Sequence, residues 1–369
     1  MALALAEPVF LETRPEVILR EVIDWYEKES GKKLYPADDE MLLINMMVYR
    51  ESLVRTIIQD VAGQNLVTKA RAPMIDYLGH LVGVFRLPAV PALATLRFSV
   101  DEAPAANILI PAGTRVSATD SVIFATDSDV LLQAGSLSVQ VHATCTDAGI
   151  AGNGWQPAQI SNLLDDIDGA DLQVVAIAPS AGGADAESDD HLRERIILAP
   201  ESFSNAGSRG AYRFHAMSAR QDIVDVAVVR SRPGTVVLYP LLATGLPDPN
   251  LLDLVAGICS DEKVRPLTDT VMVKQPVKAA YSIAATLTFM EGQDSTVVLK
   301  NAVDAINAWI QQKSARLGQD IIPSQIVAAL SVPGVYRVEL KQPGERVLAA
   351  HEWAFCTGGV ITPGGKAHG

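Results

Sequence analysis

The sequence contains few of the groups on which catalysis or metal binding usually depends. Its 369 residues include three cysteines, Cys145, Cys259 and Cys356, which are far apart and form no C-x-x-C pair. The six histidines form no H-E-x-x-H or H-x-x-x-H pair. Phosphate-binding glycine loops and the G-x-S-x-G nucleophile elbow are also absent. We therefore expect no catalytic residue, no cofactor and no metal ion, and we expect buried thiols in a protein made in a reducing cytosol.

Two further scarcities concern aromatic residues and long apolar runs. Aromatic residues make up only 5% of the chain, which disfavours the stacking surfaces that sugar-binding sites use. The sequence has no run of about 18 apolar residues, and its first residues lack the basic segment of a secretory signal. It thus predicts a soluble protein that does not insert directly into a membrane and is not exported by the usual route.

The charge is acidic and unevenly distributed. The chain carries 30 Lys and Arg against 43 Asp and Glu, which gives a net charge of −13. Residues 89–200 hold 4 basic and 15 acidic residues and no lysine, so this region would repel a phosphate backbone. Nucleic-acid binding is therefore not expected. The acidity can mean a solvated face or a surface that docks to a basic neighbour, and the sequence leaves both open.

The first 88 residues show the spacing of amphipathic helices. Apolar residues recur at helical intervals over 15–30, where Pro15 and Gly31 mark the ends, and again over 38–61 and 73–82. These apolar stripes could form an ordinary three-helix core, or one face could complete a bundle only with another subunit. The residues expected to contact such a partner are Leu19, Val22, Ile23, Tyr26, Met46, Leu53 and Ile57.

The complete pattern predicts an α+β multidomain protein with four regions. The N-terminal helical region at 1–88 is followed by an acidic all-β domain at 89–180, where alternating segments are separated by Gly, Pro, Asp and Asn clusters. An α+β domain is expected at 181–275 and a C-terminal α/β domain at 276–369. The glycine-rich tail of the last domain, from residue 358 on, is expected to be mobile.

The most informative segment of the chain combines glycines, acidic residues and arginines. It runs Gly182-Gly183-Ala184-Asp185-Ala186-Glu187-Ser188-Asp189-Asp190-His191-Leu192-Arg193-Glu194-Arg195 and is followed by Ser208-Arg209-Gly210-Ala211-Tyr212. Ser188, Asp189 or Asp190 can accept the unpaired N–H groups of a helix that begins there. Because glycine adopts backbone angles that other residues avoid, we interpret Gly182, Gly183, Gly207 and Gly210 as hinges of a structural joint without catalytic groups.

Residues 182–196 and 207–212 resemble a signature of the baseplate J family, found in contractile-tail phages, tailocins and related contractile injection systems. The segments 78–89 and 110–126 also fit the pattern of this family, so the resemblance spans roughly residues 15–345. It implies a structural wedge component of the tail baseplate that links wedges into a ring around the central hub and rearranges when the sheath contracts.

The resemblance also implies partners and a location. The N-terminal helices would join a second, I-like wedge protein, the C-terminal domains would contact other copies of this chain, and other baseplate proteins would surround them. The chain would belong to a virion tail baseplate or an equivalent particle, assembled in the cytoplasm of the bacterial host.

Two alternatives belong to other functional classes. A receptor-binding or adhesin subunit of the tail would use the β domain at 89–180, although its few aromatic residues argue against sugar recognition. An enzyme would need a site assembled from scattered residues, and only the abundance of Asp favours it. The sequence favours the structural wedge component over both.

Overall fold

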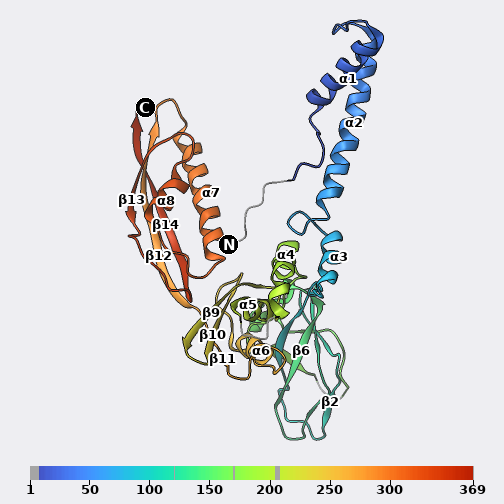
Figure 1. Ribbon diagram of the computed structural model, residues 1–369. Coiled ribbons are helices and arrows are strands. Elements are labelled where there is room, and N and C mark those ends of the chain that lie inside the picture. Colours follow the sequence, from blue (N-terminus) through green and yellow to red (C-terminus); the bar gives the residue numbers. More distant parts are fainter. Residues whose placement is uncertain (1–7, 120, 169–170, 204–207, 369) are drawn as a thin grey trace. The chain divides into compact units, whose positions relative to one another are not determined.

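The computed structural model describes residues 8–119, 121–168, 171–203 and 208–368. It divides into two compact units. The first comprises the chain up to Phe85 together with Leu192–Ile197, and the second comprises Arg86–His191 and the chain from Leu198 on. The α+β class is confirmed, with N-terminal helices, a central barrel-like sheet and C-terminal sheets with helices (Figure 1). No helix in the described ranges combines the length and the apolar character needed to cross a bilayer.

The first unit is built on a helical hairpin. α1 (Pro15–Ser30) folds back on α2 (Asp39–Gly63), and α3 (Met74–Leu81) follows (Figure 1). Pro15 lies in the first turn of α1, and Gly31 ends that helix in a left-handed conformation with φ of 67°. Ile18, Ile44 and Val48 form the buried centre of the hairpin. The three helices predicted from apolar periodicity are confirmed.

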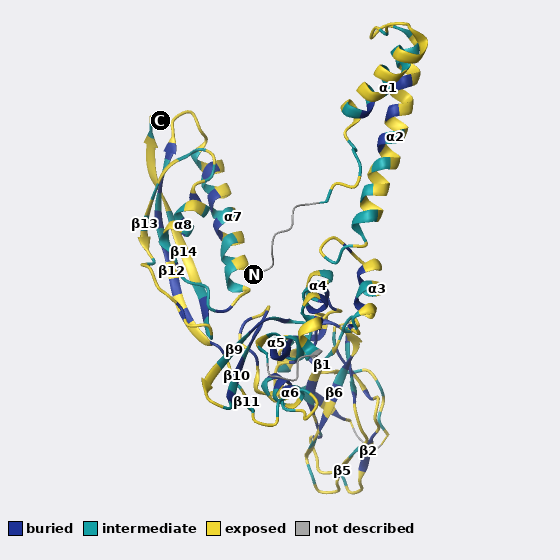
Figure 2. Ribbon diagram, viewed as in Figure 1, coloured by how far each residue is buried: buried dark blue, intermediate teal, exposed yellow. Residues whose placement is uncertain are grey.

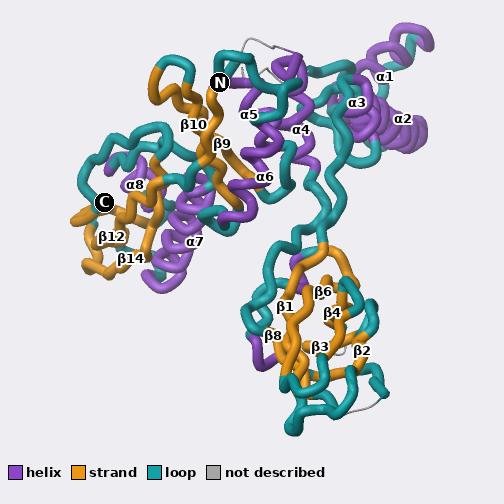
Figure 3. The backbone as a smooth tube through the Cα atoms, turned by 90° about the horizontal axis from the view of Figure 1, so that it is seen from below, coloured by secondary structure: helices purple, strands orange, loops and turns teal. Residues whose placement is uncertain are grey.

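The second unit begins with a barrel-like β domain. Its six-stranded sheet has the order β7-β3-β4-β6-β1-β8, and β2 pairs separately with β5. The strands are β1 (Pro91–Ser99), β2 (Ile108–Ile110), β3 (Arg115–Thr119), β4 (Val122–Thr126), β5 (Val130–Leu132), β6 (Ser138–Ala148), β7 (Asn162–Leu163) and β8 (Gln173–Ala176). Alternate residues of β1 are buried, including Leu96 and Phe98, as the period of a strand requires. In Figure 3 these strands surround a common interior.

A middle module of helices on a three-stranded sheet comes next. It contains the 3₁₀ segment η3 (Ala199–Phe203), α5 (Arg209–Met217), β9 (Ile223–Arg232), β10 (Thr235–Leu242), α6 (Pro249–Cys259) and β11 (Thr270–Val273). The preceding helix, α4 (Asp189–Leu198), contributes Leu192–Ile197 to the first unit. The sheet order is β11-β10-β9. The predicted hairpin across Pro233-Gly234 is present, with Gly234 at φ of 74°. α5 and α6 supply Tyr212, Met217 and Val255 to the core.

The C-terminal module consists of one three-stranded sheet and two helices. β12 (Val277–Met290) lies between β13 (Val335–Gln342) and β14 (Glu352–Ala367), and α7 (Ser295–Ser314) and α8 (Pro323–Leu330) pack on the sheet. The prediction of a mobile tail from residue 358 is wrong, because β14 continues to Ala367 and pairs in parallel with β12. A Cβ atom on Gly364 would lie 2.6 Å from the Thr286 methyl carbon. The glycine there allows close strand packing, and its presence does not indicate mobility.

Candidate functional site

The first part of the signature segment locks two loops of the second unit together. The Gly183 N–H donates to Asn153 Oδ1 at 2.8 Å, and Asn153 Nδ2 donates to the Gly183 carbonyl at 2.7 Å. A Cβ on Gly183 would lie 2.3 Å from the Gly149 carbonyl oxygen, so only glycine fits this close approach. Gly182 has a φ of 92°, a conformation that side chains disfavour. Both glycines predicted as hinges are thus required by the local backbone, and the hinge role itself stays a prediction.

Gly183→Ala is expected to lower the free energy of unfolding by about 2 kcal/mol, because a backbone carbonyl cannot move aside as a flexible side chain can. Gly257→Ala in α6 is the matched control, since its added methyl group would meet no atom within 4 Å. That control should raise stability by roughly 0.5–1 kcal/mol. Denaturant unfolding followed by circular dichroism measures both, and similar effects of the two variants would contradict the close approach at Gly183.

Glu187 is the buried centre of the next part of the signature, with 3% of its surface exposed. Its Oε2 accepts the Leu87 N–H at 2.9 Å, and its Oε1 lies 2.5 Å from His191 Nδ1. Arg86 donates to the Glu187 carbonyl at 2.6 Å and to Asp189 Oδ1 at 2.7 Å. The other ring nitrogen of His191 lies 2.9 Å from the carbonyl oxygen of the first residue of β9. A buried carboxylate with both oxygens engaged in this way stabilises the fold.

The helix that follows begins and is anchored through side-chain hydrogen bonds. Among the three predicted capping residues, Ser188 accepts the His191 N–H at 3.3 Å. Farther along α4, Arg193 donates to the carbonyls of Val67 and Ala70 at 2.9 and 2.6 Å, all within the first unit. Arg195, which is 5% exposed, donates to a third carbonyl of this unit, at Phe85. Arg193 and Arg195 of the signature therefore satisfy backbone carbonyls, a role that the sequence pattern did not reveal.

The second part of the signature, residues 208–212, begins α5 and packs into the middle module. Ser208 caps α5 by accepting the Ala211 N–H at 3.0 Å. Tyr212 is buried, and its hydroxyl donates to Asp269 Oδ2 at 2.9 Å, so burial and this hydrogen bond raise the pKa of Tyr212. A Cβ on Gly210 would lie 2.7 Å from Glu201 Cγ, which makes this position a close packing contact. Gly207, the remaining predicted hinge, lies outside the described residues.

The predicted partner-contact residues lie in two different environments within the first unit. Leu19, Val22, Ile23 and Tyr26 of α1 are partly buried against the core of the α1–α2 hairpin. Met46, Leu53 and Ile57 of α2 are exposed at 57%, 44% and 62%. The sequence had placed all seven residues at one interface, whereas the structure groups the α1 residues around the hairpin interior and the α2 residues on its outside.

The outward face of α2 is the largest uncovered apolar surface of the hairpin. Its exposed apolar residues are Leu42, Leu43, Met46, Met47, Tyr49, Leu53, Val54, Ile57, Ile58 and Val61. α2 is thus apolar on both sides, but in the described structure α1 covers only one of them (Figure 2). Large exposed apolar patches usually mark interaction sites, so this face has the character of an interaction surface.

Within the second unit, a polar and apolar junction joins the middle and C-terminal modules. Asp225 on β9, only 7% exposed, accepts the Leu317 N–H and the Val226 N–H at 2.8 Å each and pairs with Arg213. Leu317 and Trp353 of the C-terminal module pack on Leu241 of β10. The sequence analysis did not identify this junction.

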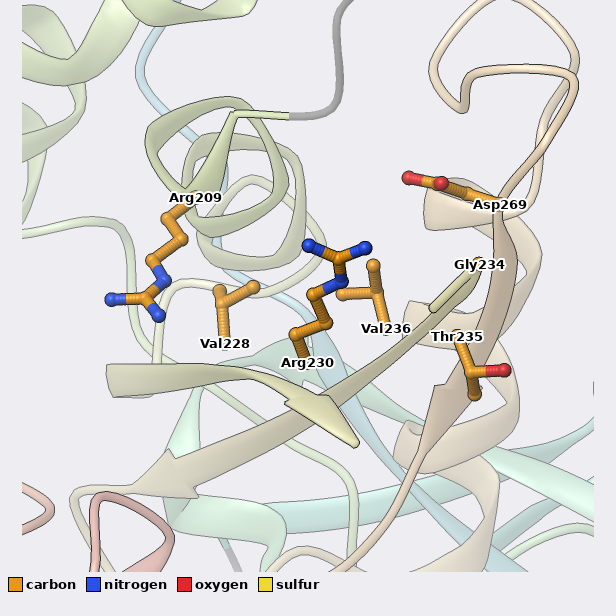
Figure 4. A pocket seen from close by; sticks show the side chains of 7 residues that line it. All are labelled: Arg209, Val228, Arg230, Gly234, Thr235, Val236 and Asp269. Atoms are coloured by element: carbon orange, nitrogen blue, oxygen red, sulfur yellow. The ribbon is translucent and has the colours of Figure 1, made fainter. Parts of the chain in front are cut away.

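A pocket of about 370 Å³ opens beside the start of α5 (Figure 4). It is lined by Arg209, Val228, Arg230, Gly234, Thr235, Val236 and Asp269. In Figure 4, the Arg230 side chain lies beside Val236, between Arg209 and Asp269. No group of three or more His, Cys, Asp or Glu side chains arranged to hold a metal occurs in the described ranges.

Buried polar groups that close loops, together with an uncovered apolar helix, are typical of a subunit that works by assembly. Three domain models of one family match the chain in succession: the baseplate J-like protein barrel domain at 95–183, the central domain at 204–275 and the C-terminal domain at 281–361. The chain belongs to the baseplate J-like protein family.

Two relatives are consistent with this assignment. Baseplate protein J of Escherichia phage P2 is 38% identical over 183 residues, which are 49% of this chain and 60% of that protein. The cryo-EM structure of the anti-feeding prophage (AFP) baseplate, 6-fold symmetrised, contains a chain with the same fold. The TM-score is 0.50 at 14% identity, and the match covers 92% of this chain and 89% of that one.

Proposed function

We propose that this chain is a structural wedge component of a contractile-tail baseplate and has no enzymatic activity. The chain would link wedges into a ring around the central hub, in a phage, tailocin or related particle assembled in the host cytoplasm. The observation that carries the proposal is the uncovered apolar face of α2, because a baseplate J-like protein with such a face needs a neighbour to bury it.

The partner at α2 would be a second, I-like wedge protein that contributes helices to a shared bundle. Met46, Leu53 and Ile57 recur at intervals of seven and four residues, so one stripe of α2 can enter the groove between two partner helices. Leu19, Val22, Ile23 and Tyr26 would support this stripe from behind by holding α1 against α2.

Contacts between copies of this chain would use the C-terminal module. β13 and β14 form the two edges of its sheet, and edge strands are available for pairing with another chain. Tyr336 and Val360 on these edges are 49% and 67% exposed. Rearrangement on sheath contraction would then turn domains about the predicted hinges Gly182, Gly183, Gly207 and Gly210 while these edge contacts persist.

The proposal is tested by size-exclusion chromatography with light scattering on the full chain, alone and co-expressed with the baseplate polypeptide encoded next to it. We expect a stable hetero-oligomer that contains more than one copy of this chain, with no oligomer of that mass when either polypeptide is expressed alone. A well-behaved monomer that ignores the neighbouring polypeptide would contradict the wedge role.

A further inference from the structure

The pocket at the start of α5 has the chemistry of a carboxylate-binding site. Arg209 and Arg230 are both exposed on its wall, and neither guanidinium takes part in a hydrogen bond or ion pair in the described part of the chain. Figure 4 shows Val228 between Arg209 and Arg230 and Val236 beside Arg230, and these two valines are the apolar floor of the pocket. Two guanidinium groups that have no partner among the described residues, next to an apolar floor, suit an acidic side chain that is flanked by apolar ones.

The one acidic side chain in this pocket is already engaged. Asp269 accepts the hydrogen bond of the buried Tyr212 hydroxyl at 2.9 Å, and no ion pair joins it to Arg209 or Arg230. Thr235, which is 5% exposed, accepts from Arg232 at 3.2 Å instead. The two pocket arginines therefore present a local excess of positive charge in a chain whose net charge is −13.

The complementary surface lies on the β domain of the same sequence. Residues 89–180, which form this domain, carry 10 acidic and 2 basic residues. In the loop after β7, Asp165 pairs with Arg115, and this ion pair lowers the pKa of Asp165. Asp166 and Asp168 are exposed, and neither has a hydrogen bond or ion pair within the described ranges. Leu164, 41% exposed, supplies an apolar side chain at the start of the same loop.

We propose that the Arg209–Arg230 pocket of one copy of this chain receives the Asp166–Asp168 loop of a second copy. The carboxylates of Asp166 and Asp168 pair with the two guanidinium groups, and Leu164 packs toward the valine floor. The charge pattern selects this occupant. The loop offers carboxylates beside an apolar residue, the pocket offers arginines beside apolar ones, and none of these charged groups has a partner within the described ranges. The inference rests on the proposed function, because it requires several copies in one particle.

This contact joins two different surfaces and is therefore heterologous. Contacts of that kind repeat head to tail and close into a ring when the rotation between neighbouring copies permits. The acidity that the sequence left unexplained then has a role, because each acidic β domain faces the basic pocket of its neighbour. Salt weakens such a contact, since the Debye length falls from about 10 Å at 0.1 M to about 3 Å at 1 M.

The test reverses the charges of these residues in the full chain, which is co-expressed with its N-terminal partner. Sedimentation velocity then measures how strongly the resulting complexes associate with one another. Arg209→Glu with Arg230→Glu should raise the dissociation constant between copies about tenfold or more, and so should Asp166→Lys with Asp168→Lys. An equal mixture of the two variants should recover association, because each reversed pocket then meets a reversed loop. The control reverses Lys263 and Lys300, two exposed lysines outside the pocket, with the same change in net charge as the arginine variant.

Recovery in the mixture but not with either variant alone supports the contact. Loss with the arginine variant but not with the aspartate variant would mean that another acidic partner fills the pocket, and it would overturn the proposal. Unchanged association of both variants, or equal loss in the lysine control, would also overturn it. Binding of the N-terminal partner should be normal throughout, and its absence in the unmodified chain would instead count against the wedge role.

Discussion

Ile57→Asp is expected to leave the chain folded and to weaken binding of its N-terminal partner by a factor of about 100 or more. Ile57 is 62% exposed on α2, so the isolated chain gains little from burying it. In a complex, the loss of an isoleucine contact costs about 1.5–3 kcal/mol, and an unpaired carboxylate at the interface adds to this cost. Each 1.4 kcal/mol is a factor of ten in affinity. Co-purification followed by titration calorimetry measures the change.

Two variants separate an effect on binding from an effect on folding. Asn45→Asp adds the same charge at an exposed polar position of α2 and should bind nearly as well as the unmodified chain. Ile23 lies against the core of the α1–α2 hairpin. Ile23→Asp should therefore lower the stability of the hairpin itself. If folded Ile57→Asp protein bound its partner normally, the outward face of α2 would not be the interface.

Asp225→Ala is expected to lower the free energy of unfolding by about 3 kcal/mol, which corresponds to a fall in Tm of roughly 6–12 °C. Asp225 is 7% exposed and is the acceptor for Arg213 and for the Leu317 N–H. Its removal takes a charged acceptor away from a partly buried guanidinium and leaves the buried Leu317 N–H without this acceptor, and such losses cost more than the hydrogen bonds contribute. Scanning calorimetry measures the transition.

The matched control for this prediction is Asp253→Ala, an exposed aspartate on α6 of the same module. It removes the same atoms at the surface and should change stability by no more than about 0.5 kcal/mol. Limited proteolysis adds a second measurement, because loss of Asp225 should also make the segment around Leu317 easier to cleave. Similar Tm values for both variants would show that Asp225 does not hold the two modules together.

The sequence predicted elements whose signals are local. Pro15 and Gly31 mark both ends of α1 within 16 residues, and the Pro233-Gly234 turn forms the β9–β10 hairpin as expected. Ser188 was among three candidates for the cap of α4, and its hydrogen bond to the His191 N–H confirms it. In each case the deciding interaction joins residues that are close in sequence, so the pattern contains it.

The unpredicted features depend on distant residues. The hydrogen bond between Asp225 and Leu317 spans 92 residues, and the one between Arg193 and Val67 spans 126. The spacing of apolar and polar residues in the sequence does not predict which distant carbonyl a side chain will contact. The prediction of a mobile tail failed for the same reason, since glycines that look like linker residues pack closely on β12.

The partner-contact residues show a related limit of periodicity. An apolar stripe indicates that a helix face will be covered, but it does not tell which neighbour covers it. Leu19 and Ile23 lie against the hairpin interior, whereas Ile57 lies outside. The residues that face the hairpin interior can be told from those that face outward only when the position of α1 on α2 is known.

β9 carries Asp225 near its beginning and Arg230 near its end, so the C-terminal junction and the arginine pocket lie on a single strand. Five residues of extended chain separate them by about 16 Å. A force applied along this strand would strain all of its hydrogen bonds to β10 at once, in shear. A force applied across the sheet would break these hydrogen bonds one after another. The middle module would therefore resist mechanical tension best in the direction that connects its pocket to its junction.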